Sequence, residues 1–194
     1  MSPTHAADAK MALRRAVLER RRAAHMADAE RSAQAVAQLV LSELDPKGTA
    51  IGGYWPLGEE LDSRPALEAL ALAGATMVLP VVAGQGQVLI FRAWAPGDSL
   101  DSGPFGTMHP GTQAQIIRPR VILVPLIAFD LDGGRLGYGA GYYDRTIAAF
   151  RADGQVTAIG LAYDAQRVDT VPTDPHDQPL DAVITPSGIL WFSE

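Results

Sequence analysis

The residues best suited to chemistry lie in one segment, 125–145, which reads PLIAFDLDGGRLGYGAGYYDR. It leads from an apolar run to a predicted helix through Gly137, Gly139 and Gly141. Glycine lets backbone N–H groups approach a phosphate closely. The N-terminus of the following helix adds unpaired N–H donors and the positive end of the helix dipole. The segment therefore predicts a phosphate-binding loop.

Two charged side chains flank this loop. Arg135 offers a planar, permanently charged guanidinium that can hold two phosphate oxygens at once. Asp144 offers a hard oxygen ligand, of the kind that Mg²⁺ takes beside nucleotide phosphates. Together with the glycines, these residues indicate a nucleotide that is bound through its phosphates with Mg²⁺.

Other glycine motifs do not fit this spacing. A dinucleotide-binding fingerprint needs a third glycine where this chain has Tyr142, and a Walker A loop needs a Gly-Lys pair, which the chain lacks. A glycine turn with a purely structural role is the alternative. Three glycines at alternate positions, between an arginine and a Tyr-Tyr-Asp sequence, favour the binding loop.

A second set of cations lies near the N-terminus. Nearly all the positive charge of the chain is arginine, and the only lysines are Lys10 and Lys47. Lys10 and Arg14 are four residues apart, so they project from the same face of a predicted helix. They are either a ligand-binding pair or part of an exposed charge stripe on a surface helix.

The elements that must position these residues alternate along the chain. Residues 6–44 are rich in Ala, Leu, Arg and Glu and predict two helices in series, with a break near 25–28. Further helices are predicted from Arg64 onward and at 142–152. The predicted strands are 49–55, 76–82, 87–94, 120–127, 156–162, 182–185 and 189–192, and a Gly-, Pro- and Ser-rich loop is predicted at 95–112.

This order of elements predicts the fold class. After Arg120, the run to Ile127 is apolar throughout, as in a strand that is covered on both faces. Strands that alternate with helices indicate a mostly parallel central sheet with helices on both sides. We therefore expect a three-layer α/β/α fold. Because there is no internal repeat and no long linker, residues 1–194 are predicted to form one domain.

Composition excludes several classes of protein. The chain has no cysteine, which rules out disulfides, thiolate zinc sites and a cysteine nucleophile. No run is apolar enough to span a membrane, and the N-terminus lacks the pattern of a secretory signal, so we expect a cytoplasmic protein. The net charge of −6 gives no support to nucleic-acid binding. The arginines at 14–15 and 20–22 are interpreted as a solvated helix face, and we expect a monomer.

The sequence at 135–145, RLGYGAGYYDR, resembles the signature of the 5-formyltetrahydrofolate cyclo-ligase family, also called methenyltetrahydrofolate synthetases. The resemblance runs from about Lys10 to Thr185 and implies ATP-dependent closure of 5-formyltetrahydrofolate to its 5,10-methenyl form. It implies that Lys10, Arg14 and Arg135 contact ATP phosphates, with Lys10 and Arg135 serving catalysis. The loop residues that it assigns to ATP are Gly137, Tyr138, Gly139, Ala140, Gly141, Tyr142, Tyr143 and Asp144.

The same resemblance implies a folate site. In YWPLGEELD at 54–62, Glu60 matches the substrate-binding glutamate of the family and Trp55 its apolar contact. A carboxylate can accept adjacent N–H groups of a reduced pterin, and an aromatic wall can shelter the ring. Tyr138 and Tyr142 are implied to contact the substrate as well. The alternatives are that Trp55 belongs to the core and that Glu60 is a charge on the approach to a helix.

The C-terminal part is implied to supply a second Mg²⁺ ligand beside Asp144. Asp181 is predicted for this role, with Asp177 as the competing candidate. The chain departs from the family at His109, where many relatives have Glu or Gln before the proline. A further alternative is a paralogue that binds ATP and folate without turnover. The expected partners are the small-molecule substrates alone.

Overall fold

The computed structural model describes residues 3–192 and is built around a seven-stranded sheet. Its strand order is β11-β10-β9-β6-β1-β2-β3. The strands are β1 (Ala50–Gly52), β2 (Thr76–Val82), β3 (Leu89–Ala93), β6 (Val121–Pro125), β9 (Thr157–Leu161), β10 (Ala182–Thr185) and β11 (Gly188–Trp191). The five inner strands are parallel, and β3 and β11 pair antiparallel at the two edges. The prediction of a mostly parallel sheet is confirmed.

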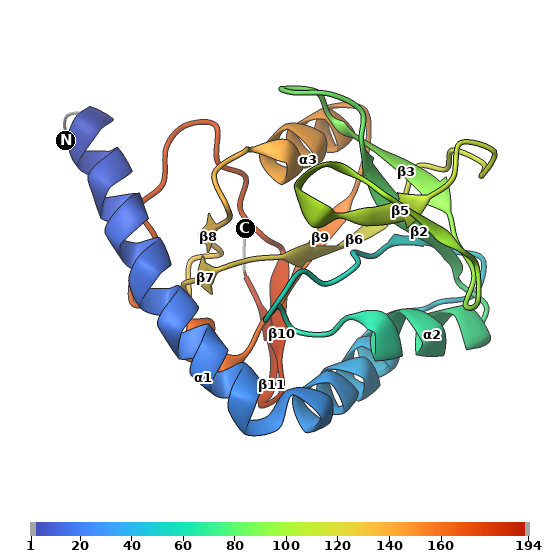
Figure 1. Cartoon of the computed structure of the whole chain (residues 1–194), viewed down its shortest axis with the longest axis horizontal. Coiled ribbons are helices and arrows are strands. Elements are labelled where there is room, and N and C mark those ends of the chain that lie inside the picture. Colours follow the sequence, from blue (N-terminus) through green and yellow to red (C-terminus); the bar gives the residue numbers. More distant parts are fainter. Residues whose placement is uncertain (1–2, 193–194) are drawn as a thin grey trace.

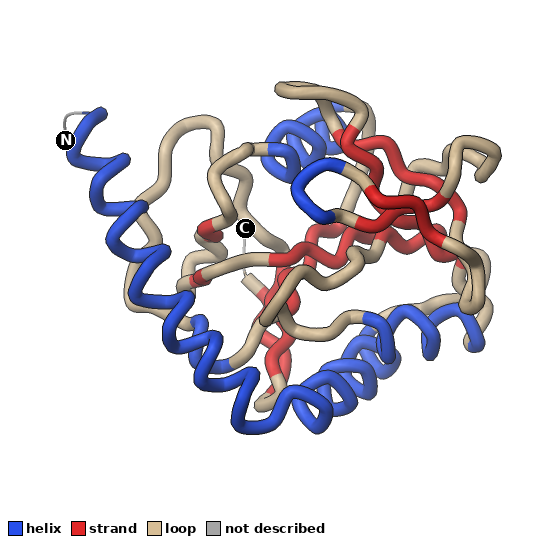
Figure 2. The backbone as a smooth tube through the Cα atoms, in the orientation of Figure 1, coloured by secondary structure: helices blue, strands red, loops and turns tan. Residues whose placement is uncertain are grey.

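Helices cover both faces of this sheet (Figures 1 and 2). On one face, α1 (Pro3–Glu43) and α2 (Arg64–Leu72) pack on alternate side chains of the strands, such as Leu123 and Ile159. On the other face, α3 (Tyr142–Ala152) packs on the intervening side chains, such as Ile122 and Val124. Because successive strand residues point to opposite faces, a strand between two helical layers must be apolar throughout. This gives the three-layer α/β/α fold that the sequence predicts.

The N-terminal region forms one long helical element, α1, in which a kink joins two helical segments in series. Asp28 lies inside α1 with φ −163° and ψ 57°, which is outside the helical region. The break therefore falls within the predicted 25–28 interval. The residues before it run along the side of the molecule, and the residues after it turn beneath the sheet beside α2 (Figure 1).

Two predicted boundaries need correction. β1 ends at Gly52, three residues before the predicted end of the first strand. The segment at 95–112 is not all loop, since it contains a hairpin of β4 (Leu100–Ser102) and β5 (Met108–Pro110) with a short 3₁₀ turn between them. Strands of three residues in a Gly- and Pro-rich segment carry little periodic pattern, which is why the sequence does not reveal them.

Candidate functional site

The glycine-rich loop lies beyond the carboxyl end of β6. After β6 the chain forms a small sheet of β7 (Ala128–Phe129) and β8 (Arg135–Leu136), and the loop at 137–141 then leads into α3. Within the described part of the chain, no N–H group of residues 138–141 donates a hydrogen bond to the backbone. These donors lie at the edge of the sheet where open α/β folds bind ligands, next to the N-terminus of α3.

Two loop positions require glycine for their backbone conformation. Gly139 has φ +99° and Gly141 has φ +67°, both in the left-handed region that side chains rarely adopt. A Cβ atom at Gly141 would also lie 2.7 Å from Nη1 of Arg145. The Arg145 side chain in turn donates a 2.7 Å hydrogen bond to the carbonyl of Ala140. The loop is thus held from behind by its own helix.

The turn before the loop is fixed by Asp130, which positions Arg135. The Asp130 carboxylate accepts 2.7 Å hydrogen bonds from the N–H groups of Gly134 and Val171. A Cβ atom at Gly134 would lie 2.6 Å from this carboxylate, so the tight approach depends on glycine. Asp130 is 3% exposed and serves the structure of the site.

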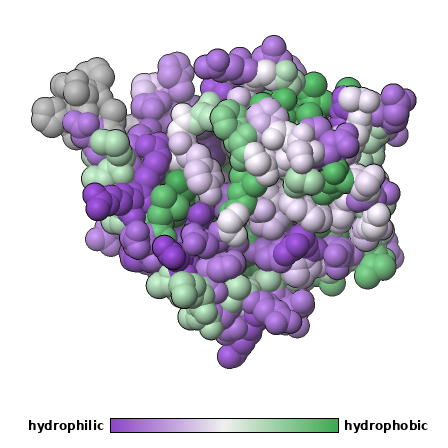
Figure 3. Space-filling view, viewed as in Figure 1, coloured by the Kyte–Doolittle hydropathy of each residue, from purple (hydrophilic) through white to green (hydrophobic). Residues whose placement is uncertain are grey.

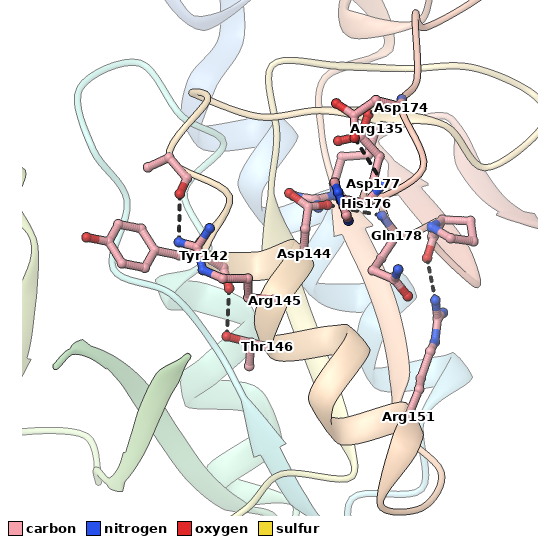
Figure 4. Close-up of polar contacts among 12 residues, drawn as sticks. Arg135, Tyr142, Asp144, Arg145, Thr146, Arg151, Asp174, His176, Asp177 and Gln178 are labelled. Atoms are coloured by element: carbon pink, nitrogen blue, oxygen red, sulfur yellow. Dashed lines mark hydrogen bonds and ion pairs between the residues drawn. The ribbon is translucent and has the colours of Figure 1, made fainter. Parts of the chain in front are cut away.

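Arg135 and Asp144 form the centre of the predicted phosphate site (Figure 4). The Arg135 side chain is 4% exposed and forms an ion pair with Asp144 through Nη2. Its Nε atom is buried without a hydrogen-bond partner in the described residues. Oδ1 of Asp144 also accepts the N–H of Gln178 at 3.1 Å. A buried guanidinium with an unused donor favours an anionic ligand at this position.

The first helix brings two further cations to this edge. Lys10 Nζ lies 2.9 Å from Oδ2 of Asp174 and 2.5 Å from Oδ2 of Asp177. Arg14 Nε donates a 2.8 Å hydrogen bond to the carbonyl of Gly137 in the glycine loop. The structure therefore brings Lys10, Arg14 and the loop together from segments more than 100 residues apart. An exposed charge stripe, the alternative interpretation of this pair, does not fit these contacts.

Lys10 is charged in this arrangement. Burial lowers its pKa, but the hydrogen bonds and charges of Asp177 and Asp174 outweigh burial, and the pKa of Lys10 is raised overall. The hydrogen bond from Lys10 likewise lowers the pKa of Asp174. Lys10 thus stays cationic at neutral pH and is held by carboxylates that a phosphate could replace.

A cavity of about 340 Å³ lies against these residues. Arg135, Asp174, Asp177 and Gln178 line it, together with the hydroxyl-bearing Thr170 and Thr173. The surface is also hollowed on the face shown in Figure 3, between the first half of α1 and α3.

A second polar group, the Glu60 cluster, consists of Glu60, Tyr138 and Arg21. The hydroxyl of Tyr138 donates to Oε1 of Glu60 at 2.8 Å and accepts from Nη1 of Arg21 at 2.9 Å. Oε2 of Glu60 accepts the N–H of Leu57 at 2.8 Å. Tyr138 belongs to the glycine loop, so the predicted folate-binding carboxylate and the predicted phosphate loop adjoin.

Burial dominates the electrostatics of this cluster. Glu60 is 4% exposed, and burial raises the pKa of its carboxyl group despite the opposing hydrogen bonds from Leu57 and Tyr138 and the charge of Arg21. Burial and the charge of Glu60 also raise the pKa of Tyr138 to about 12. Burial, followed by the charge of Glu60, raises the pKa of Tyr143 as well. Both tyrosines are therefore neutral phenols that can donate hydrogen bonds.

The two other predicted substrate contacts are less closely joined to Glu60. Trp55 packs on the core beneath α1 and α2. The centres of the Trp55 and Trp94 rings are 6.0 Å apart in an edge-on arrangement, and the guanidinium of Arg64 lies 5.6 Å from the centre of the Trp55 ring. Tyr142 packs on the core beneath α3, and its ring lies 6.3 Å from that of Phe105 in the β4–β5 hairpin. The contacts of Trp55 correspond to the alternative in which it belongs to the core.

The structure does not place Asp181, the predicted second metal ligand, in contact with Asp144. Its carboxylate accepts 3.0 Å hydrogen bonds from Nη2 of Arg151 and a 2.6 Å bond from the N–H of Ala158. Ala158 lies near the start of β9, and Arg151 lies in the last turn of α3, whereas Asp144 lies in its first. Asp144 and Arg151 are seven positions apart in the helix, about 10 Å along its axis. The contacts of Asp181 are thus with Arg151 and β9, and none of them leads to Asp144.

Asp177, the competing candidate for the second metal ligand, lies near Asp144 and Arg135. The N–H of the next residue, Gln178, donates to Asp144, and Asp177 lines the cavity beside Arg135 (Figure 4). His109, the departure from the family pattern, lies in β5. Its Nδ1 atom is 3.0 Å from the carbonyl of Pro110, and its ring would lie 2.7 Å from a Cβ atom at Gly103. His109 therefore packs within its own hairpin.

Arg21 is a buried residue of this site that the sequence did not indicate. The interpretation of the arginines at 20–22 as a solvated face is wrong for Arg21, which is 4% exposed. Helical spacing could have found it, because residues 10, 14, 21 and 25 recur at intervals that keep them on one face of a helix. His25 lies on this face too, with its Nδ1 atom 3.1 Å from the hydroxyl of Tyr163.

Together, the fold and the site define a class of protein: a three-layer α/β enzyme with a cation-lined glycine loop beside a buried carboxylate. A model of the 5-formyltetrahydrofolate cyclo-ligase family matches residues 6–186. The chain therefore belongs to this family.

Two relatives and two solved structures agree with this assignment. The 5-formyltetrahydrofolate cyclo-ligase of Mycolicibacterium smegmatis is 37% identical over 190 residues, which cover 93% of this chain and 96% of the relative. The 5-formyltetrahydrofolate cyclo-ligase of Escherichia coli is 36% identical over 138 residues, which cover 67% of this chain and 74% of the relative. The 5,10-methenyltetrahydrofolate synthetases of Mycoplasma pneumoniae and Aquifex aeolicus have TM-scores of 0.71 and 0.74 at 27% and 28% identity. They cover 91% and 95% of this chain, and 98% and 93% of their own lengths are matched.

Although α1 has 41 residues, neither it nor any other helix within residues 3–192 contains an apolar run long enough to cross a bilayer.

Proposed function

We propose that this chain converts 5-formyltetrahydrofolate and ATP into 5,10-methenyltetrahydrofolate, ADP and phosphate. The observation that carries the proposal is the contact between Tyr138 of the glycine loop and the buried Glu60, within a chain that belongs to the cyclo-ligase family. This contact joins a candidate site for a phosphate to a candidate site for a pterin. A reaction in which ATP activates a folate needs these two sites side by side.

The chemistry explains why ATP is consumed. The formyl group on N5 is amide-like, so its carbon is a poor electrophile and its oxygen a poor leaving group. Transfer of the γ-phosphoryl group to the formyl oxygen converts that oxygen into a phosphate ester and leaves ADP. N10 of the same folate then attacks the activated carbon, the C–O bond breaks, and phosphate departs with the formyl oxygen. The protein mainly aligns the substrates and neutralises charge.

The cations at the carboxyl edge suit the nucleotide. Lys10 and Arg135 are proposed to bind the transferring phosphates, and Arg14 to hold the glycine loop in place through the carbonyl of Gly137. The N–H groups of residues 138–141 supply further donors. In this proposal ATP replaces the carboxylates of Asp174 and Asp177 on Lys10, and the charge of Lys10 is retained throughout.

Mg²⁺ fits the residues at this edge. Oδ1 of Asp144 is occupied by Arg135 and the N–H of Gln178, which leaves Oδ2 for a metal. Mg²⁺ beside nucleotide phosphates usually binds one or two protein carboxylates together with phosphates and water. Mg²⁺ would neutralise phosphate charge there, and Asp144 and Asp177 are the proposed protein ligands.

A first prediction distinguishes the metal candidates. Asp144→Asn keeps the shape of the side chain but removes its charge, so the Mg²⁺ concentration required for half-maximal turnover should rise by an order of magnitude or more, or turnover should be lost. Asp181→Asn is the matched control and should leave that concentration unchanged, because Asp181 bonds Arg151. Titration of activity with Mg²⁺ measures this. An unchanged requirement in Asp144→Asn would remove Asp144 from the metal site.

A second prediction concerns folate. Glu60→Gln replaces one carboxylate oxygen with an amide donor that would face a pterin N–H. The KM for 5-formyltetrahydrofolate should rise by roughly ten- to a hundredfold, the effect of losing a hydrogen bond to a charged group, while the KM for ATP stays nearly constant. Steady-state kinetics with each substrate varied in turn measure both constants. A selective loss of ATP affinity would move Glu60 out of the pterin site.

The reaction itself is tested by absorbance. The purified protein should form the methenyl product from 5-formyltetrahydrofolate only when ATP is present. A paralogue that binds ATP and folate without turnover is the alternative, and formylfolate-dependent release of ADP would exclude it.

A further inference from the structure

Arg21 is a buried cation that the proposed chemistry does not yet use. It is 4% exposed, while its neighbours Arg20 and Arg22 are exposed. Its Nε atom is buried and has no hydrogen-bond partner among the described residues. Burial of a guanidinium donor without a partner is unfavourable and rare in proteins. A ligand that accepts this hydrogen bond would remove the cost.

The contacts of Arg21 indicate where such a ligand binds. Its Nη1 atom donates to the hydroxyl of Tyr138 at 2.9 Å, and the same hydroxyl donates to Glu60 at 2.8 Å. One oxygen atom therefore lies between a donor on Arg21 and an acceptor on Glu60. The Arg21 guanidinium also lies 5.8 Å from the centre of the Tyr138 ring. Any ligand that replaces this phenol must offer an acceptor to Arg21 and a donor to Glu60.

Tyr138 is suited to being displaced. It is 52% exposed, and it lies between Gly137 and Gly139. Gly139 has φ +99°, and glycines on both sides leave the backbone of this residue few steric limits. Arg21 and Glu60, by contrast, are held on α1 and on the segment after β1, and both are 4% exposed. The two charged groups are buried, and the phenol between them belongs to the exposed residue of the cluster.

We propose that Arg21 and Glu60 together recognise the lactam edge of the reduced pterin ring, and that Tyr138 occupies this position until folate binds. The lactam edge carries a carbonyl oxygen next to an N–H group. Arg21 donates to the carbonyl oxygen, and Glu60 accepts from the N–H. This assignment rests on the proposed function and adds Arg21 to it as a specificity residue.

The assignment predicts which pterins are rejected. In a 4-amino analogue of the substrate, an amino group replaces the carbonyl oxygen and the adjacent ring nitrogen loses its hydrogen. A donor then faces the donors of Arg21, and an acceptor faces the carboxylate of Glu60. A site that leaves buried polar groups unpaired discriminates strongly against such an analogue. Wild-type protein should therefore prefer 5-formyltetrahydrofolate to its 4-amino analogue. Removal of the Arg21 guanidinium should reduce this preference, and the part that remains is due to Glu60.

The experiment measures the binding of both ligands by calorimetry to the wild type and to Arg21→Leu, Arg21→Gln and Arg22→Leu. Arg21→Leu should bind 5-formyltetrahydrofolate about ten- to a hundredfold more weakly and the 4-amino analogue with little change. Arg21→Gln retains one amide donor and should fall between Arg21→Leu and the wild type. Arg22→Leu, with an exposed side chain on the same turn of α1, should match the wild type.

The outcomes separate this inference from the proposed function. An equal loss of affinity for both ligands in Arg21→Leu would show a purely structural role of Arg21 and overturn the inference. An unchanged preference for 5-formyltetrahydrofolate over the 4-amino analogue would overturn it as well. In either case the ATP-dependent formation of methenyl product by the wild type and Arg22→Leu would still establish the reaction. If the wild type binds formylfolate with the predicted preference but makes no product, the proposed function fails and the binding assignment stands.

Discussion

Arg135→Ala should reduce kcat/KM for ATP roughly thirty- to a thousandfold, which corresponds to a loss of about 2–4 kcal/mol of transition-state stabilisation. Arg135 is almost wholly buried at the start of the glycine loop, and its Nε atom has no hydrogen-bond partner in the described residues. A desolvated guanidinium interacts with phosphate far more strongly than an exposed one does. Lys10→Ala should have an effect in the same range, because Lys10 is cationic and faces the same edge.

Steady-state kinetics with ATP as the varied substrate test this expectation. Arg31→Ala is the matched control, since the Arg31 side chain is 87% exposed on α1 and should not affect turnover. Arg135→Ala also leaves Asp144 without its ion-pair partner, so thermal unfolding of each variant must be measured in parallel. Equal activity in Arg135→Ala, Lys10→Ala and Arg31→Ala would eliminate the proposed phosphate site.

A second large effect is expected when the formyl oxygen of the substrate carries an isotope label, because the label should be either present in the released phosphate or absent from it. If ATP phosphorylates that oxygen, the oxygen leaves bound to phosphorus when N10 closes the ring. About one labelled oxygen should then appear in phosphate for each turnover, as in-line phosphoryl transfer requires. Mass spectrometry of the released phosphate measures the label directly.

Direct cyclisation would give a different result. The formyl oxygen would leave as water, and ATP would be hydrolysed in a separate step. Unlabelled phosphate with a full yield of methenyl product would therefore exclude the phosphorylated intermediate. This outcome would change the mechanism without moving any residue from the site, because positions of side chains alone do not define the order of bond changes.

The regular elements were largely determined by the sequence. α3 at 142–152 and the strands at 76–82 and 182–185 have the predicted bounds. These elements depend on the spacing of apolar residues along one segment, which is a local property. The β4–β5 hairpin escaped prediction because its strands have three residues each and pair in register through a glycine-rich turn. That pairing depends on contacts that a local pattern does not record.

The phosphate loop was also accessible from the sequence alone. Glycine at 137, 139 and 141 and the charges at Arg135 and Asp144 lie within ten residues, so their proximity follows from the chain itself. Lys10 and Arg14 share a helical face for the same reason. Their approach to this loop is a different matter, since it depends on how the first half of α1 packs across the molecule.

Only the tertiary structure shows which groups Asp181 and Arg21 contact. Asp181 follows the sequence pattern of a metal ligand, yet its carboxylate turns to Arg151 at the opposite end of α3 from Asp144. Arg21 stands between two exposed arginines and reads as part of a solvated face, yet it is buried against Tyr138 and beside Glu60. The sequence determines which groups a segment carries. Which of them meet is decided by long-range packing, because side chains that bond here are separated by up to 167 residues of chain.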